Sequence, residues 1–255
     1  MLRAVLAVAL LAMSGAASAE EFCANRPGLA TGTCALGPGI FQLESSLIDW
    51  SSATADGERT RELTLGAGML RAGVGHSTEI QLAWVPWTRV RTSSASGHSS
   101  VSGAGDAMLA SKTLVVDGPV SLAVAPFVKL PVARKALGNG RVEAGLLVPV
   151  EFDLPHGWGI AVSPEIDWNA DADGHHAGIG GAVSLGHPLA DDLWLAFDVA
   201  VARDLDPDGH SSSAIVGVSL AWQARPSLQL DVEADAGLHG DQPGIELVAG
   251  FSWQL

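Results

Sequence analysis

The sequence predicts an all-β protein that folds as a closed antiparallel transmembrane β-barrel of about 12 strands. Apolar and polar residues alternate over twelve successive segments, and short turns and longer polar loops join these segments in strict alternation. An even strand number with short turns at one end and longer loops at the other is typical of outer-membrane barrels. We therefore expect short periplasmic turns, longer extracellular loops, apolar side chains against lipid and polar side chains in the lumen.

Each expected strand is close in length to the ~9–11 residues that a tilted strand needs to cross a bilayer. The clearest one covers residues 228–238, where Leu228, Leu230 and Val232 share one face while Asp231 and Glu233 share the other. A period of two residues indicates a strand and not a helix. The expected strands are 41–48, 63–70, 79–90, 108–116, 120–130, 142–152, 158–168, 177–185, 193–201, 214–222, 228–238 and 245–255.

The connections and the tryptophans agree with this barrel. Short turns are expected at 72–76, 117–118, 155–157, 187–192 and 224–226, and longer loops at 51–60, 92–105, 132–140, 170–175, 203–213 and 239–243. Several tryptophans stand at strand ends, as in the aromatic girdles of membrane barrels, namely Trp50, Trp158, Trp168, Trp194, Trp222 and Trp253. A soluble β-sandwich would also alternate, but the long, even strands favour the membrane barrel.

The N-terminal residues predict export and a disulfide. Residues 1–19 combine Arg3, a short apolar run and an Ala-x-Ala ending at Ala19, which is the pattern of a cleaved secretory signal peptide. We expect a periplasmic N-terminal segment over residues 20–38 and the outer-membrane barrel over residues 39–255. The two cysteines, Cys23 and Cys34, are expected to form a disulfide in an oxidising compartment. The expected location is the outer membrane of a Gram-negative bacterium.

The charge balance limits the partners. The formal net charge is −14, and nucleic-acid binding needs a basic surface instead. Alternation assigns acids and fewer bases to the lumen, as structural charge ladders or as a lining that favours cations. The expected lumen-lining residues are Glu44, Glu79, Arg89, Lys112, Lys129, Glu143, Glu151, Glu165, Asp167, Asp198, Asp231, Glu233 and Asp235.

Two outward loops carry residues that metals can use. Asp204, Asp206 and Asp208, followed by Gly209, match the opening of a calcium loop, but the twelfth position is Ile215 and not Glu. A second loop crowds acids beside His175 and His176 without regular metal-ligand spacing. We interpret both as polar loops, expect no metal and no cofactor, and leave calcium at the first loop open.

A lipid esterase within a barrel is the enzymatic alternative. His98 precedes Ser99, and His210 precedes Ser211. Adjacent residues on a strand point to opposite faces, so neither pair forms a nucleophile–base contact by itself. We therefore expect no catalytic residues and no enzyme activity.

Five segments resemble a family of Gram-negative outer-membrane proteins named for the MetA pathway of phenol degradation. They are Cys23-Ala24-Asn25-Arg26-Pro27-Gly28 with Thr31-Gly32-Thr33-Cys34, Gln42-Leu43-Glu44, Pro126-Phe127-Val128-Lys129-Leu130-Pro131, Leu137-Gly138-Asn139-Gly140 and Ser163-Pro164-Glu165-Ile166-Asp167-Trp168. The resemblance implies a barrel that passes small, aromatic or hydrophobic molecules, and it supplies no catalytic residues. One departure is Leu255 at the end, where such barrels usually carry an aromatic residue.

The sequence thus predicts an outer-membrane channel for passive passage of small solutes. The expected partners are outer-membrane lipid, a small-molecule solute and, during biogenesis, the barrel-assembly machinery. A closed barrel with a structural or surface-interaction role is the alternative, and its lumen would be filled by paired charges and large side chains.

Overall fold

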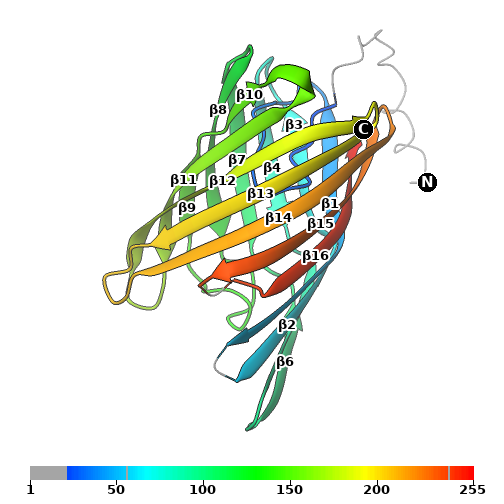
Figure 1. Cartoon of the computed structure of the whole chain (residues 1–255). Helices are drawn as coiled ribbons and strands as arrows, with labels where there is room; N and C mark the ends of the chain where they lie inside the picture. Colours follow the sequence, from blue (N-terminus) through cyan, green and yellow to red (C-terminus); the bar gives the residue numbers. More distant parts are fainter. Residues whose placement is uncertain (1–21, 56, 241) are drawn as a thin grey trace, which may run out of the picture.

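The computed structural model describes residues 22–55, 57–240 and 242–255, which form one closed antiparallel barrel (Figure 1). The expected signal peptide lies outside these residues. The strand segments are β1 (Phe41–Ala55), β2 (Glu58–Leu65), β3 (Ala67–Gly73), β4 (Thr78–Trp84), β5 (Trp87–Ser94), β6 (Gly97–Gly103), β7 (Ala107–Val116), β8 (Val120–Leu130), β9 (Glu143–Leu147), β10 (Val150–Asp153), β11 (Gly159–Ala170), β12 (His175–Ala190), β13 (Leu193–Asp204), β14 (Ser211–Arg225), β15 (Leu228–His239) and β16 (Ile245–Gln254).

Sixteen segments build twelve wall strands because four wall strands are interrupted. The segment pairs β2/β3, β4/β5, β6/β7 and β9/β10 each form one wall strand, so the strand number expected from the sequence is confirmed. Pro86 interrupts β4/β5 and Pro149 interrupts β9/β10, since proline cannot donate a hydrogen bond to the ladder. Gly66, with φ +71°, separates β2 from β3. The barrel closes where β1 pairs with β16, from Gln42 opposite Gln254 to Ser52 opposite Ile245.

The burial pattern is the reverse of a soluble protein. Arg71, Glu79 and Lys112 are fully buried, whereas Ile166 and Val201 are 61% and 57% exposed. Soluble proteins rarely bury charged side chains so completely, and an apolar outer band around a polar interior is the arrangement of membrane barrels. The alternation expected from the sequence therefore has its apolar face outward. Within the described residues, no helix has the length and apolar character to cross a membrane.

Tryptophans mark the two rims of the apolar band. Trp158 and Trp168 lie ten residues apart at opposite ends of the same wall strand, and both are exposed. Ten residues at about 3.3 Å each, tilted by about 40°, span about 25 Å, the usual height of the band. Trp222 and Trp253 lie on the short-turn side with Trp158. Trp194 lies at the start of β13 on the same side but shares the inward parity of Asp198, and it lines a cavity together with Trp158.

Two regions expected to be loops are paired strands. The ranges 51–60 and 92–105 are largely occupied by the ends of β1 and β2 and by β5 and β6. In Figure 1, β2 and β6 extend beyond the rest of the barrel at the end opposite the C-terminus. Their residues are polar on both faces, so the sequence carries no alternation signal there, while backbone pairing still continues the ribbon. Of the other loops at this end, residues 171–174 and 205–210 are shorter than expected, the connection between β15 and β16 keeps its expected length, and residues 131–142 between β8 and β9 are longer.

Candidate functional site

Residues 22–40 form a plug inside the barrel, and we call this segment the luminal plug. Its backbone N–H groups donate hydrogen bonds to side chains from five wall strands. These bonds run from Asn25 to Glu44, Gly28 to Glu233, Thr31 to Ser163, Thr33 to Glu151 and Leu36 to Glu79. We expected this segment on the periplasmic side of the barrel, but the structure places its described residues against the inner wall. The physical reason is that buried luminal carboxylates need donors, which an irregular backbone supplies.

Arg26 anchors the plug to the wall between β15 and β1. Its Nε donates to both oxygens of Asp231 at 3.1 Å, and its Nη2 lies 2.7 Å from Oδ1 of the same carboxylate. A third nitrogen, Nη1, donates to the Ser46 hydroxyl at 2.8 Å, and the Arg26 carbonyl accepts from Gln229 at 2.7 Å. A fork of this kind is among the strongest hydrogen-bonded ion pairs in proteins. The side chain of Asp231 is 0% exposed, so Arg26 neutralises a carboxylate that has no access to water.

Arg71 organises a second buried charge cluster. Its guanidinium donates to both carboxylate oxygens of Glu79 at 2.8 Å and to Glu44 at 2.7 Å. It also donates to the carbonyl of Cys23 in the plug. The sequence predicted Glu44 and Glu79 for the lumen but missed Arg71, since the expected strand ended at Leu70. The continued alternation of β3 is the signal that identifies it.

Lys112 and the disulfide hold the middle of the plug. The Lys112 ammonium donates to Oδ1 of Asn25 at 2.6 Å and to the carbonyl of Gly32 at 3.1 Å. The sequence placed Lys112 in the lumen, and the structure shows that these hydrogen-bond partners lie in the plug. Cys23 and Cys34 are joined by a disulfide, which closes a loop within the plug and limits the conformations it can adopt.

The expected lumen residues face inward, with one exception. Some of these side chains are buried, and the others line cavities or contact the plug. The inward residues are Glu44, Glu79, Lys112, Lys129, Glu143, Glu151, Glu165, Asp167, Asp198, Asp231, Glu233 and Asp235. Arg89 faces away from the lumen and lies 5.1 Å over the Trp87 ring. The interruption at Pro86 shifts the alternation by one residue, so Thr88 takes the inward position.

Two cavities follow one another along the lumen on the long-loop side of the plug. The first holds about 560 Å³ and is lined by plug residues and by Met69, Leu147 and Glu165. The second holds about 570 Å³ and reaches toward Lys129 and Glu143, which form an ion pair. Both cavities share Ala67, Gly68, Ala83, Met108 and Phe127. Apolar side chains therefore line the junction of the two cavities within a lumen that is otherwise acidic.

A third cavity lies on the short-turn side. It holds about 490 Å³ and is lined by Trp158, Trp194, Ser121 and Glu151. Ser121 and Glu151 both bond to Thr33 of the plug. The plug therefore separates this cavity from the two on the long-loop side.

The structure brings together the two outward loops that the sequence kept apart. Nε2 of His176 lies 2.9 Å from Oδ1 of Asp204, and Nδ1 lies 3.8 Å from Oδ2 of Asp171. Burial of the ring opposes its protonation, but the hydrogen bond with Asp204 and the charges of Asp204, Asp206 and Asp171 outweigh it and raise the pKa of His176. In the first loop, Asp204 and Asp206 turn toward His176, and no calcium ring with Asp208 forms among the described residues.

Comparisons with known proteins support the barrel. The family model described as "Putative MetA-pathway of phenol degradation" matches residues 24–255. An outer membrane channel from Pseudomonas putida F1 is similar in structure, with a TM-score of 0.68 and 15% identity over 88% of this chain and 98% of the channel. The autotransporter translocator domain NalP from Neisseria meningitidis has a TM-score of 0.54 and 13% identity over 86% of this chain and 90% of that domain.

The NanC porin gives a TM-score of 0.53 at 10% identity, over 85% of this chain and all of the porin. At these identities the likeness concerns the fold alone. Among curated proteins, none matches this sequence.

Proposed function

Since this chain belongs to the family described as "Putative MetA-pathway of phenol degradation", we propose that it is an outer-membrane channel for small aromatic or hydrophobic solutes. The short turns would face the periplasm and the longer loops the exterior, as in other outer-membrane barrels. Lipid would cover the apolar band, and the barrel-assembly machinery would insert the chain. The two barrel relatives named as a channel and a porin support a transport role.

One observation carries the choice of solute. The two long-loop cavities, of about 560 and 570 Å³, meet at Met108 and Phe127. Ligand cavities of such size, lined by apolar and aromatic side chains with a few polar groups, suit small organic molecules. Methionine adapts its shape to different ligands and contacts aromatic rings favourably. A phenol-sized solute would bury its ring at this junction while a hydroxyl reaches Glu165.

The luminal plug would control passage from the two long-loop cavities to the third cavity, on the short-turn side. It lies between the cavities on its two sides, and its anchors are ionic and hydrogen-bonded. A solute would cross when part of the plug leaves the wall. The surrounding carboxylates would favour cations over anions as accompanying ions.

Ion currents through single proteins in planar bilayers test this proposal, with phenol as the probe. Phenol in the long-loop compartment is expected to interrupt the current by occupying the cavities. Phe127→Ala removes the ring shared by both cavities and is expected to weaken the interruption about 2-fold to 10-fold, from about 0.5–1.5 kcal/mol of aromatic contact. Phe197→Ala is the matched control, because Phe197 is 52% exposed on the outer face.

Two results would reject the proposal. The first is the absence of any conductance, which would favour the closed structural or surface-interaction barrel. The second is an equal effect of phenol on Phe127→Ala and on the unchanged protein. We also expect no enzyme activity, and hydrolysis of a lipid ester that is lost in Ser99→Ala or Ser211→Ala would contradict this.

A further inference from the structure

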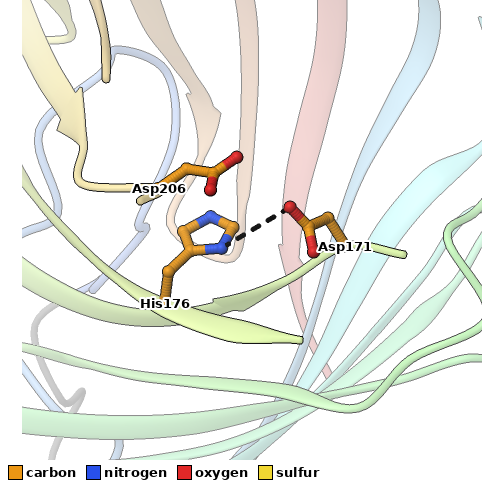
Figure 2. Close-up of side chains that lie close together, drawn as sticks. All are labelled: Asp171, His176 and Asp206. Atoms are coloured by element: carbon orange, nitrogen blue, oxygen red, sulfur yellow. Dashed lines mark ion pairs between the residues drawn. The ribbon is translucent and has the colours of Figure 1, made fainter. Parts of the chain in front are cut away.

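At the long-loop rim, Asp171, His176 and Asp206 lie close together although they come from two different loops and a strand end. Figure 2 shows the imidazole of His176 between the carboxylates of Asp171 and Asp206. One oxygen of each carboxylate and one ring nitrogen all lie within 4.8 Å of one another. We infer that these three residues bind a divalent transition-metal ion of the zinc type. This site goes beyond the proposed channel function and does not depend on it.

The strand register explains why the cluster forms. β12 and β13 pair with Gly178 opposite Asp204, and the Leu205 amide donates to the Ala177 carbonyl at 3.0 Å. The chain leaving β13 therefore passes directly beside the start of β12. This pairing carries Asp206 to His176, while Asp171 closes the neighbouring turn between β11 and β12. His176 thus lies on a paired strand, and Asp171 and Asp206 lie in short loops that directly follow hydrogen-bonded strand ends.

Asp204 holds the imidazole in the orientation that a metal needs. It is bonded to Nε2 at 2.9 Å, which leaves Nδ1 directed toward Asp171. The separation from Nδ1 to Asp171 is 3.8 Å, longer than a hydrogen bond. Metal-binding histidines commonly use one ring nitrogen for the ion and donate from the other to a carboxylate. Asp204 is therefore a positioning residue, and the side chain of His176 is only 7% exposed.

Both ligand carboxylates are also oriented by their own loops. Oδ1 of Asp171 accepts from the amides of Asp173 and Gly174, at 2.8 and 3.0 Å. Oδ1 of Asp206 accepts from the amide of Asp208 at 2.9 Å. In each carboxylate the second oxygen is left for an ion. Backbone donors of this kind fix the direction in which the free oxygen of each carboxylate points.

The donor set selects the type of ion. Zn²⁺ accepts both imidazole nitrogen and carboxylate oxygen as ligands, whereas calcium prefers oxygen ligands alone. Tetrahedral ligands at about 2.1 Å from zinc are about 3.4 Å apart, so the three atoms need to approach by about 1 Å. The two loops can make this movement, and water can supply the fourth ligand.

Binding would tie the loop of residues 171–174 to the loop of residues 205–210. Asp204 also lines a cavity of about 240 Å³ beside Asp167 and Asn169 at the same rim. A bound ion would therefore fix the outer ends of β11, β12 and β13 at the entrance to the lumen.

Calorimetric titration of Zn²⁺ into the full-length, detergent-folded protein tests the site. We expect the protein to bind one ion per chain with saturation. His176→Gln and Asp206→Asn should each lower the affinity for Zn²⁺ at least tenfold. Asp204→Asn should lower it 10–100-fold, the range known for residues that position a metal ligand. His175→Gln is the matched control, because its exposed ring stacks 6.0 Å from Trp168 outside the cluster. We expect it to bind as the unchanged protein does.

A heat-dependent gel shift for every variant shows whether the barrel has folded. The inference is overturned if the folded protein takes up no Zn²⁺, or if His176→Gln and Asp206→Asn retain the full affinity. An equal loss in His175→Gln and His176→Gln would also overturn it, because surface histidines would then bind the ion. Ca²⁺ is titrated in parallel. If Ca²⁺ binds as tightly as Zn²⁺ and His176→Gln does not change its affinity, the site consists of carboxylates alone and the inference is overturned.

Discussion

Replacing Arg26 by Met should loosen the luminal plug while leaving the barrel wall intact. Met keeps most of the side-chain volume but removes every hydrogen bond to Asp231 and Ser46. Asp231 would then be a buried carboxylate without a partner, since its side chain is 0% exposed. Breaking a buried ion pair costs about 3–5 kcal/mol. Because Arg26 itself is 16% exposed, the lower value applies.

A cost of about 3 kcal/mol raises the population with a detached plug by about 150-fold. A barrel whose plug is detached should conduct more current. Single-channel recording should therefore show that Arg26→Met spends more of its time in a state of larger conductance. The barrel wall is held by twelve paired strands, so the temperature of the heat-dependent gel shift should stay near that of the unchanged protein. Arg203→Met removes an exposed arginine on β13 and serves as the matched control.

The double variant Arg26→Met/Asp231→Asn tests whether the plug loosens because Asp231 keeps an unpaired charge or because the contacts of Arg26 are lost. If the unpaired carboxylate causes the loosening, removing its charge restores most of the plug docking. The reasoning is refuted if Arg26→Met leaves the conductance unchanged, or if the double variant opens as often as Arg26→Met alone.

Three further changes follow from the same structure. Arg71→Met leaves Glu79 buried and unpaired, so we expect a loss of about 3–5 kcal/mol in the free energy of unfolding, measured by urea titration in liposomes. Reducing the disulfide between Cys23 and Cys34, whose sequence separation is 11, removes about 3 kcal/mol of loop constraint and should lengthen the larger-conductance openings. Val232→Arg puts a charge on the lipid face and should cost about 2–4 kcal/mol in the same urea titration.

Each of these changes has its own control. Arg203→Met should leave the urea midpoint unchanged, and a midpoint loss equal to that of Arg71→Met would argue against the buried cluster. A Cys23→Ser/Cys34→Ser variant should not respond to reductant, and a response there would assign the effect to something other than the disulfide. Val132→Arg lies in the loop after β8 and should be tolerated, so an equal cost at both valines would contradict the lipid contact.

The wall strands could be predicted because their signal is local. In β15, a side chain that touches lipid follows every one that touches the lumen, so the sequence itself repeats with period two. The signal failed where the backbone departs from that repeat. Pro86 moves Arg89 to the outer face, and the projecting ends of β2 and β6 meet water on both sides. Backbone pairing continues there without any pattern in the side chains.

The plug and the metal cluster could not be predicted, because their contacts join distant residues. Arg26 and Asp231 are 205 residues apart in sequence, and the plug has no periodic pattern that could assign it to the lumen. Asp171 and Asp206 each looked like part of an ordinary polar loop. The register of β12 against β13 brings Asp206 to His176, and the turn between β11 and β12 brings Asp171.

The distribution of bases predicts which part of the lumen favours cations. Arg71 and Lys112 lie on β3 and β7, where Arg71 pairs with Glu44 and Glu79 and Lys112 donates to the plug. Across the lumen, Asp198 and Asp235 are 2% and 5% exposed, and neither forms an ion pair among the described residues. The plug supplies Arg26 to Asp231 alone. We therefore expect a cation that passes the plug to move along β13 and β15, where these carboxylates lie without a paired base among the described residues, and we expect an anion to be disfavoured there.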